Sequence, residues 1–125
     1  MKIRNSKIQK VDVYCAFPGP KTTINIKTIS AFGEWNFTLV MPNKPDMFQL
    51  RALLDFSNVK RTDEMEGRII REVVCGNEVI GYGDPIVDKF FLFNNKENFV
   101  TENDLKLWII SAPIIIKKEK SNRKF

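Results

Sequence analysis

The sequence predicts an α+β protein with a mostly antiparallel sheet of five or six strands and two helices on one face. Three observations support this fold class. Several segments alternate apolar and polar residues, which is the two-residue period of a strand. Two other segments repeat apolar residues every three or four positions, as a helix does. Short turn sequences separate neighbouring strands, and such turns connect antiparallel strands.

The first three predicted strands are Lys10 to Phe17, Thr22 to Ser30 and Trp35 to Met41. The first two alternate clearly, and the third is rich in aromatic and β-branched residues. Pro18-Gly19-Pro20 predicts a turn, because proline has no N–H to donate to a strand ladder. The residues expected to face the core are Val11, Val13, Cys15, Ile24, Ile26 and Thr28.

The first helix is predicted to start at Asn43-Lys44-Pro45-Asp46, since proline suits the first helical turn. It should end near Phe56-Ser57-Asn58. The apolar residues of this segment follow one another at spacings of three and four, which predicts an amphipathic helix. These residues are Met47, Leu50, Leu53 and Leu54.

The next two strands are Gly67 to Cys75 and Glu78 to Tyr82, joined by the two-residue turn Gly76-Asn77. A hairpin turn with glycine first requires positive φ, so we expect Gly76 to adopt it. Side chains alternate across a strand. We therefore expect Arg71 to place its charge at the sheet rim and Arg68 to face solvent.

The last third of the chain is less regular. Asp84 to Asn94 is predicted to be extended or irregular. Thr101, with Asp104 three residues later, resembles the capping box at the start of a second helix, and Pro113 ends that helix. Residues 114 to 118 form a candidate last strand, so the predicted order is β-β-β-α-β-β-α with an optional final strand.

The composition, 43% hydrophobic and 28% charged over 125 residues, is that of one globular domain. We assign residues 1–116 to this domain and residues 117–125 to a basic tail. No signal peptide and no apolar run of about 20 residues is present, which predicts a cytoplasmic protein without membrane insertion. Two cysteines, Cys15 and Cys75, are too few for a disulfide scaffold, and we expect buried thiols.

The net charge of +5 is concentrated at the two ends of the chain. The first ten residues carry +4, the last nine also carry +4, and the middle is therefore mildly acidic. Basic ends attract phosphates, although they also serve as solubilising extensions. The candidate phosphate contacts of the tail are Lys117, Lys118, Lys120, Arg123 and Lys124.

The sequence lacks the residues that several kinds of catalysis require. The chain has no histidine, which excludes His-based triads and disfavours zinc and iron sites. Gly81-Tyr82-Gly83 lacks the third glycine of a dinucleotide loop, and Pro85 blocks the helix that should follow. Asp46 and Asp104 are better explained as helix caps than as nuclease carboxylates. We therefore expect no enzyme activity, no catalytic residues, no cofactor and no metal.

The segment from Phe90 to Phe93 combines aromatic and basic residues. Such a mixture can stack nucleic-acid bases or form a protein interface. Alternatively, the phenylalanines close the hydrophobic core. The candidate binding surface comprises Lys89, Phe90, Phe91, Phe93 and Lys96.

The stretch from Met65 to Phe91 resembles a segment of small uncharacterised proteins encoded by phages and prophages. That segment reads Gly-Lys, a short strand with Arg, Ile-Gly-His, and then Asp-Lys before Trp-Phe. Here the matching residues are Gly67 to Arg71, Val79 to Asp84 and Ile86 to Phe91. Asp84 stands at the histidine position and Phe90 at the tryptophan position. The resemblance implies a phage accessory protein, without implying a reaction.

The leading functional hypothesis is therefore a non-catalytic phage or prophage accessory protein. It would bind a host protein or complex, such as an anti-CRISPR-like defence target, and inhibit or redirect it. The alternative is a nucleic-acid-binding protein that uses the basic termini and the aromatic segment. For the full chain we expect only weak, non-specific nucleic-acid binding. Salt separates the two hypotheses, because each phosphate contact releases a counterion and DNA binding then weakens steeply with salt. The oligomeric state is left open.

Overall fold

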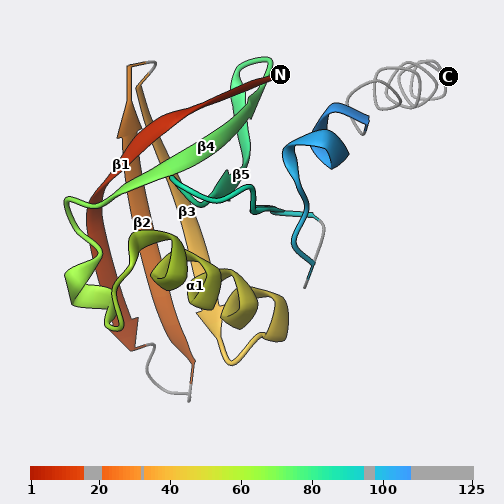
Figure 1. Ribbon diagram of the computed structural model, residues 1–125. Coiled ribbons are helices and arrows are strands. Elements are labelled where there is room, and N and C mark those ends of the chain that lie inside the picture. Colours follow the sequence, from red (N-terminus) through yellow and green to blue (C-terminus); the bar gives the residue numbers. More distant parts are fainter. Residues whose placement is uncertain (16–20, 32, 95–97, 108–125) are drawn as a thin grey trace, which may run out of the picture.

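The computed structural model describes residues 1–15, 21–31, 33–94 and 98–107. It confirms the α+β class: the strands form one curled antiparallel sheet of six strands in the order β3-β2-β1-β4-β5-β6 (Figure 1). Within these residues no helix is long and apolar enough to cross a membrane. The strands are β1 (Lys2–Cys15), β2 (Thr22–Ser30), β3 (Gly33–Met41), β4 (Ile69–Cys75), β5 (Glu78–Gly83) and β6 (Phe90–Leu92).

β1 is the longest strand and connects two halves of the sheet. Its first part, from Lys2 to Lys7, pairs with β4, and its second part, from Lys7 to Cys15, pairs with β2. The sequence predicted only the second part, because the first part is mostly polar. Ser6 is nevertheless buried, and its hydroxyl donates to the carbonyl of Ile29.

Three core predictions for the far end of β1 are only partly met. Val11 packs at the edge of the core, whereas Val13 and Cys15 are exposed. The reason is that α1 packs mainly against β3 and leaves this end of β1 uncovered. The expectation of two buried thiols is also wrong, since Cys75 is only half-buried. Both cysteines are free.

Helix α1 (Lys44–Ser57) begins and ends as the sequence predicts. The Asn43 side chain accepts a hydrogen bond from the backbone N–H of Asp46, and Pro45 lies in the first turn. Asn58 ends the helix in the left-handed conformation, with φ of 56°. A short 3₁₀ helix, η1 (Thr62–Glu64), follows before β4.

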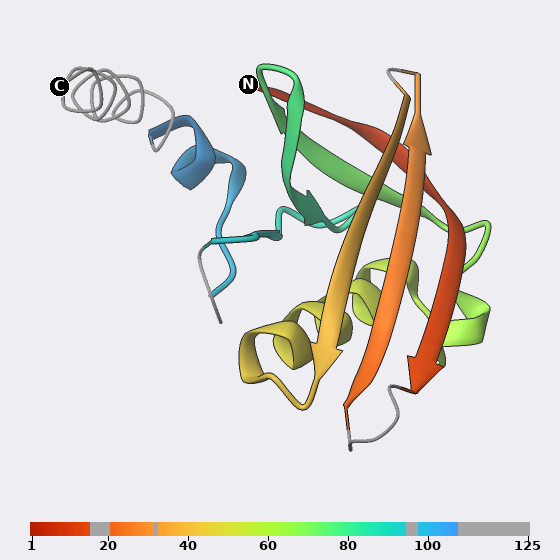
Figure 2. The ribbon, with the colours of Figure 1, turned by 180° about the vertical axis from the view of Figure 1, so that it is seen from behind.

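The main core lies between α1 and the sheet. Figure 2 shows β1, β2 and β3 side by side with α1 behind them. Ile24, Ile26 and Thr28 of β2 are buried, as predicted. The fully packed members of the cluster come from all three long strands, from α1, from the segment between η1 and β4, and from the second half of the sheet: Ile8, Ile24, Ile26, Leu39, Ala52, Leu53, Phe56, Met65, Ile70, Val74, Val79, Tyr82 and Phe91.

A second cluster packs the other helix. Residues 102–107 are helical, and the predicted capping box is present: Asp104 accepts hydrogen bonds from the N–H and the hydroxyl of Thr101. These two bonds lower the pKa of Asp104. Leu105 is buried against Val73, Phe90 and Leu92. The predictions for residues 108–125, including Pro113, a last strand and the basic tail, lie outside the described residues.

The hairpin between β4 and β5 has the predicted turn. Gly76 has φ of 63°, and Cys75 pairs with Glu78. A Cβ at Gly76 would meet no atom within 4 Å, so a substitution is opposed by the backbone conformation alone. We expect Gly76→Val to lower the free energy of unfolding by more than about 1 kcal/mol, measured by urea denaturation. Asn77→Val, at the neighbouring turn position, is the matched control; equal losses for both variants would contradict the turn assignment.

Candidate protein-binding surface

The aromatic segment proposed from the sequence lies largely inside the protein. Phe90 and Phe91 are both completely buried, so their assignment to an exposed binding surface is wrong and the core interpretation is confirmed. The reason is that β6 has a packed cluster on each side: Phe91 belongs to the main core, and Phe90 belongs to the second cluster. Phe93 is half-buried, with its ring 5.5 Å from that of Phe37.

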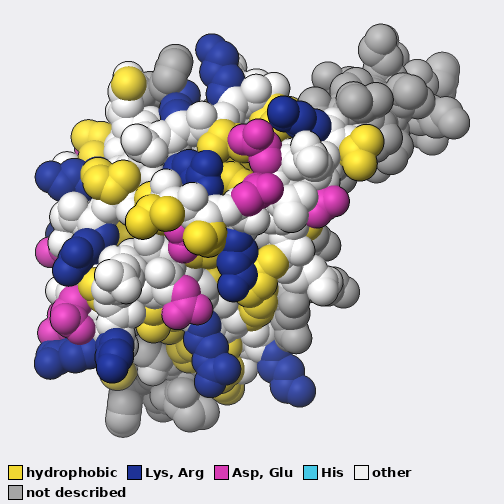
Figure 3. Space-filling model, in the orientation of Figure 1, with side chains coloured by type: hydrophobic (Ala, Val, Ile, Leu, Met, Phe, Trp, Pro, Cys, Tyr) yellow, Lys and Arg dark blue, Asp and Glu magenta, His cyan; other side chains and the backbone are white. Residues whose placement is uncertain are grey.

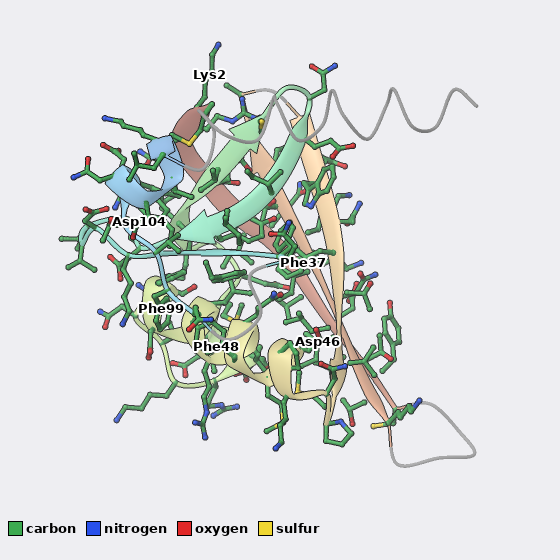
Figure 4. All side chains as sticks on the ribbon, turned by 90° about the vertical axis from the view of Figure 1, so that its right-hand side faces the viewer. Lys2, Phe37, Asp46, Phe48, Phe99 and Asp104 are labelled. Atoms are coloured by element: carbon green, nitrogen blue, oxygen red, sulfur yellow. The ribbon has the colours of Figure 1, made fainter. Side chains whose placement is uncertain are left out.

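The basic members of that candidate surface have other surroundings. Lys89 is half-buried, and its ammonium nitrogen lies 4.1 Å from the centre of the Phe99 ring. Phe99 in turn packs on Phe48 of α1, with ring centres 4.8 Å apart (Figure 4). Lys89 therefore packs on the face of the Phe99 ring and is not free to contact a ligand. Lys96 lies outside the described residues, as do Lys117, Lys118, Lys120, Arg123 and Lys124.

Arg71 organises the loop between β5 and β6, residues 84–89. Its guanidinium donates hydrogen bonds to the carbonyls of Asp84 and Val87, and it lies 4.8 Å from the centre of the Phe90 ring. As predicted, Arg68 is exposed; Arg71 is half-buried in β4, an inner strand of the sheet, and its guanidinium lies against the loop after β5. Arg71 therefore ties the loop to β4 at two points.

Asp84 fixes the loop from within. Its carboxylate accepts hydrogen bonds from the N–H groups of Ile86 and Val87, at 2.8 and 3.0 Å. Its own N–H donates to the carbonyl of Lys89 at 2.9 Å. At the end of the loop, Asp88 accepts a hydrogen bond from the N–H of Glu102, at the start of the second helix. The loop is held by hydrogen bonds along its whole length.

The fixed loop carries apolar side chains into solvent. Ile86 is 89% exposed and Val87 is 51% exposed. Ile69 at the start of β4 is 46% exposed and, like these two residues, lines an open groove of about 600 Å³. We call Ile69, Pro85, Ile86 and Val87 the Ile86 surface. The groove is completed by the end of α1 and the approach to β4: Asp55, Phe56, Ser57, Asn58, Gly67, Arg68 and Asp84.

No protein-family model, curated protein or solved structure matches this chain. The assignment of a function therefore depends on the surface chemistry of the chain itself.

Sequence reasoning missed the Ile86 surface, although a signal for it exists. Asp84-Pro85 is a typical start of a turn, and two apolar residues follow it directly. Apolar residues at the tip of a turn have few core neighbours. The phenylalanines further along, which the sequence favours as a binding surface, are larger but belong to a strand.

On the face drawn in Figure 3, the charged side chains of the described residues are mixed in sign: lysine and arginine are interspersed with aspartate and glutamate. Arg4 pairs with Glu72 and Lys10 pairs with Asp12, so cations of the first ten residues have acidic partners. This arrangement reduces the basic character that the sequence suggested for the N-terminus.

The residues considered for catalysis have local structural roles. Asp46 accepts a hydrogen bond from the N–H of Val40, while Asp104 caps the second helix. Gly81-Tyr82-Gly83 lies in β5, where glycine is needed because a Cβ at Gly81 or Gly83 would collide with β6. The Tyr82 hydroxyl bonds that of Thr28 inside the core, and burial raises the pKa of Tyr82.

Proposed function

We propose that this protein is a non-catalytic binding module that holds another protein at the Ile86 surface. The observation that carries this proposal is an isoleucine that is 89% exposed on a loop fixed by hydrogen bonds. Exposure of a single apolar residue is ordinary, but several neighbouring apolar residues along a groove are typical of a protein interface. Ile86 would insert into an apolar pocket of the partner.

The fixed geometry of the loop favours binding. Association normally costs conformational entropy, because flexible loops and side chains become ordered at the interface. Here Arg71 and Asp84 hold the loop before any partner arrives. A short apolar projection can then contribute most of its burial free energy to affinity. The charged residues Asp55, Arg68 and Asp84 around the groove would orient the partner.

The resemblance of Met65–Phe91 to phage-encoded proteins supports a more specific proposal. All four residues of the Ile86 surface lie within that segment. We propose that the chain is a phage or prophage accessory protein that acts in the host cytoplasm. Its partner would be a host protein or complex, such as a defence effector, which it inhibits or redirects.

The test begins with finding the partner at this site. A photo-crosslinking amino acid at position 86 of the full chain, expressed in bacterial cells, should capture a protein that is then purified. Ile86→Asp should weaken binding to that purified protein by about 30-fold or more, as for a central interface residue. Val13→Asp is the matched control, since Val13 is also exposed but lies at the far end of β1. Isothermal titration calorimetry measures both.

Two results would contradict the proposal. One is a partner whose affinity is the same for the Ile86→Asp variant and for the unmodified chain. The other is nanomolar binding to random duplex DNA at physiological salt, with a steep salt dependence. Non-specific DNA binding is ordinarily micromolar or weaker under those conditions, so the second result would move nucleic-acid binding to first place.

A further inference from the structure

β3 forms one edge of the six-stranded sheet, next to β2. Nine consecutive residue pairs join β3 to β2, from Gly33 with Ser30 to Met41 with Thr22, without a register shift. In an antiparallel ladder, alternate residues direct their backbone groups to the paired strand, and the residues between them direct theirs to the other side. β3 therefore presents a regular row of backbone donors and acceptors at the sheet edge.

Val40 shows which residues of β3 face the open side. Its N–H donates to the carboxylate of Asp46 at 2.8 Å, and its carbonyl accepts from the N–H of Asn43 at 3.0 Å. Both partners belong to the start of α1 and not to β2; Figure 4 labels Asp46 beside this strand. Because the register is regular, residues at two-residue steps from Val40 also direct their backbone groups outward. These residues are Glu34, Asn36 and Thr38.

The open part of the edge has few features that block pairing. The side chains of Glu34, Asn36 and Thr38 are exposed, and in the described part of the chain no hydrogen bond joins their backbone groups to another element. Proteins commonly protect an edge strand with proline, lysine or a bulge. β3 contains none of these, and its one charged residue, Glu34, pairs with Lys27 of β2 at 3.0 Å.

We propose that β3 pairs with β3 of a second copy of this chain, antiparallel and about a two-fold axis at Asn36. In this register Asn36 faces Asn36 of the second copy, and Glu34 faces Thr38. No like charges are opposed, and a hydrogen-bonded ladder of about six bonds forms, at two for each pair. Moving the axis by one residue toward Val40 would form fewer hydrogen bonds between the copies, because the backbone groups of Val40 are already bonded to Asp46 and Asn43.

The opposite face of the same ladder is already packed within each copy. Trp35 and Phe37 pack against the main core, and the Phe37 ring lies 5.0 Å from that of Tyr82. The contact between the two copies would therefore be made by the backbone ladder and the outward side chains. Such a contact is isologous, since the same residues are used by both copies, and it closes as a dimer. It is independent of the Ile86 surface, which lies on β4 and the loop after β5. The dimer would therefore carry two copies of that surface.

The test uses the charge at the proposed axis. Sedimentation equilibrium of the full chain should show a reversible dimer. Asn36→Lys and Asn36→Glu should each weaken it by about tenfold, because two like charges then face each other. An equimolar mixture of the two variants should recover dimerisation, since unlike charges then meet. This recovery requires residue 36 of one copy to lie close to residue 36 of the other, as in the register centred on Asn36.

Asn103→Lys is the matched control, because Asn103 is exposed on the second helix and the charge change is the same. This variant should dimerise like the unmodified chain, and circular dichroism should show that every variant is folded. A chain that stays monomeric up to about 1 mM would overturn the proposal. A dimer that Asn36→Lys leaves unchanged, or a mixture without recovery, would overturn it as well.

Discussion

Replacing Arg4 by methionine should lower the free energy of unfolding by about 3 to 5 kcal/mol, the loss expected when one partner of a buried ion pair is removed. Arg4 Nε lies 2.5 Å from Glu72 Oε1, and the Glu72 side chain is only 2% exposed. Without the guanidinium, a carboxylate remains in the interior between β1 and β4 with its main charge partner removed. Urea denaturation at neutral pH measures this loss.

The double variant Arg4→Met with Glu72→Met separates the ion pair from packing. Two apolar side chains of similar size avoid the buried charge, so the double variant should recover most of the stability. Lys10→Met is the matched control. Its ion pair with Asp12 is exposed, with an N–O distance of 3.7 Å, and should contribute less than about 1 kcal/mol. A double variant as unstable as Arg4→Met would show that the charge is not the cause.

Replacing Gly81 by alanine should lower the free energy of unfolding by about 3 kcal/mol, the upper range for overpacking a core. A Cβ at this position would lie 2.1 Å from the carbonyl oxygen of Phe91 and 3.0 Å from the Cα of Leu92. Both are backbone atoms, so β5 and β6 would have to separate. Faster amide hydrogen exchange in β6, together with urea denaturation, would report this change.

Gly83 provides the comparison for Gly81. A Cβ at Gly83 would lie 2.1 Å from the ring of Phe90, which is a side chain that can be replaced. Phe90→Leu should therefore restore part of the stability lost in Gly83→Ala. Leu92→Ala should restore none of that lost in Gly81→Ala, because the backbone obstacle stays. Equal restoration in the two pairs would contradict this account of β5.

The sequence was sufficient to predict the structure at positions where a local rule determines it. Asn43, Pro45 and Asn58 delimit α1 because capping depends on residues within one turn of the helix end. The turn at Gly76 was predictable for the same reason. The first half of β1 was not predictable, because it pairs with residues far along the chain, as Arg4 does with Glu72, 68 positions away.

The candidate site was harder to predict than the fold. Hydrophobicity alone does not distinguish Phe90, which is buried by β6 pairing, from Ile86, which a turn places in water. The distinction depends on Arg71, whose two hydrogen bonds to the loop join residues more than ten positions apart. No periodic pattern in the sequence reports such contacts. The Asp-Pro turn was the one local signal.

The shared strand β1 also determines the order in which this protein can fold. Its pairs with β2 join residues that are close in sequence, but Lys7 pairs with Ile69 and Lys2 pairs with Val74, which are 62 and 72 positions away. On the ribosome, β1, β2 and β3 can therefore associate while the first residues of β1 still wait for β4 to be synthesised. Closing so long a segment is entropically slow. During that interval we expect the nascent chain to expose one unpaired flank of β1, and the sheet to be completed after its hairpins have formed.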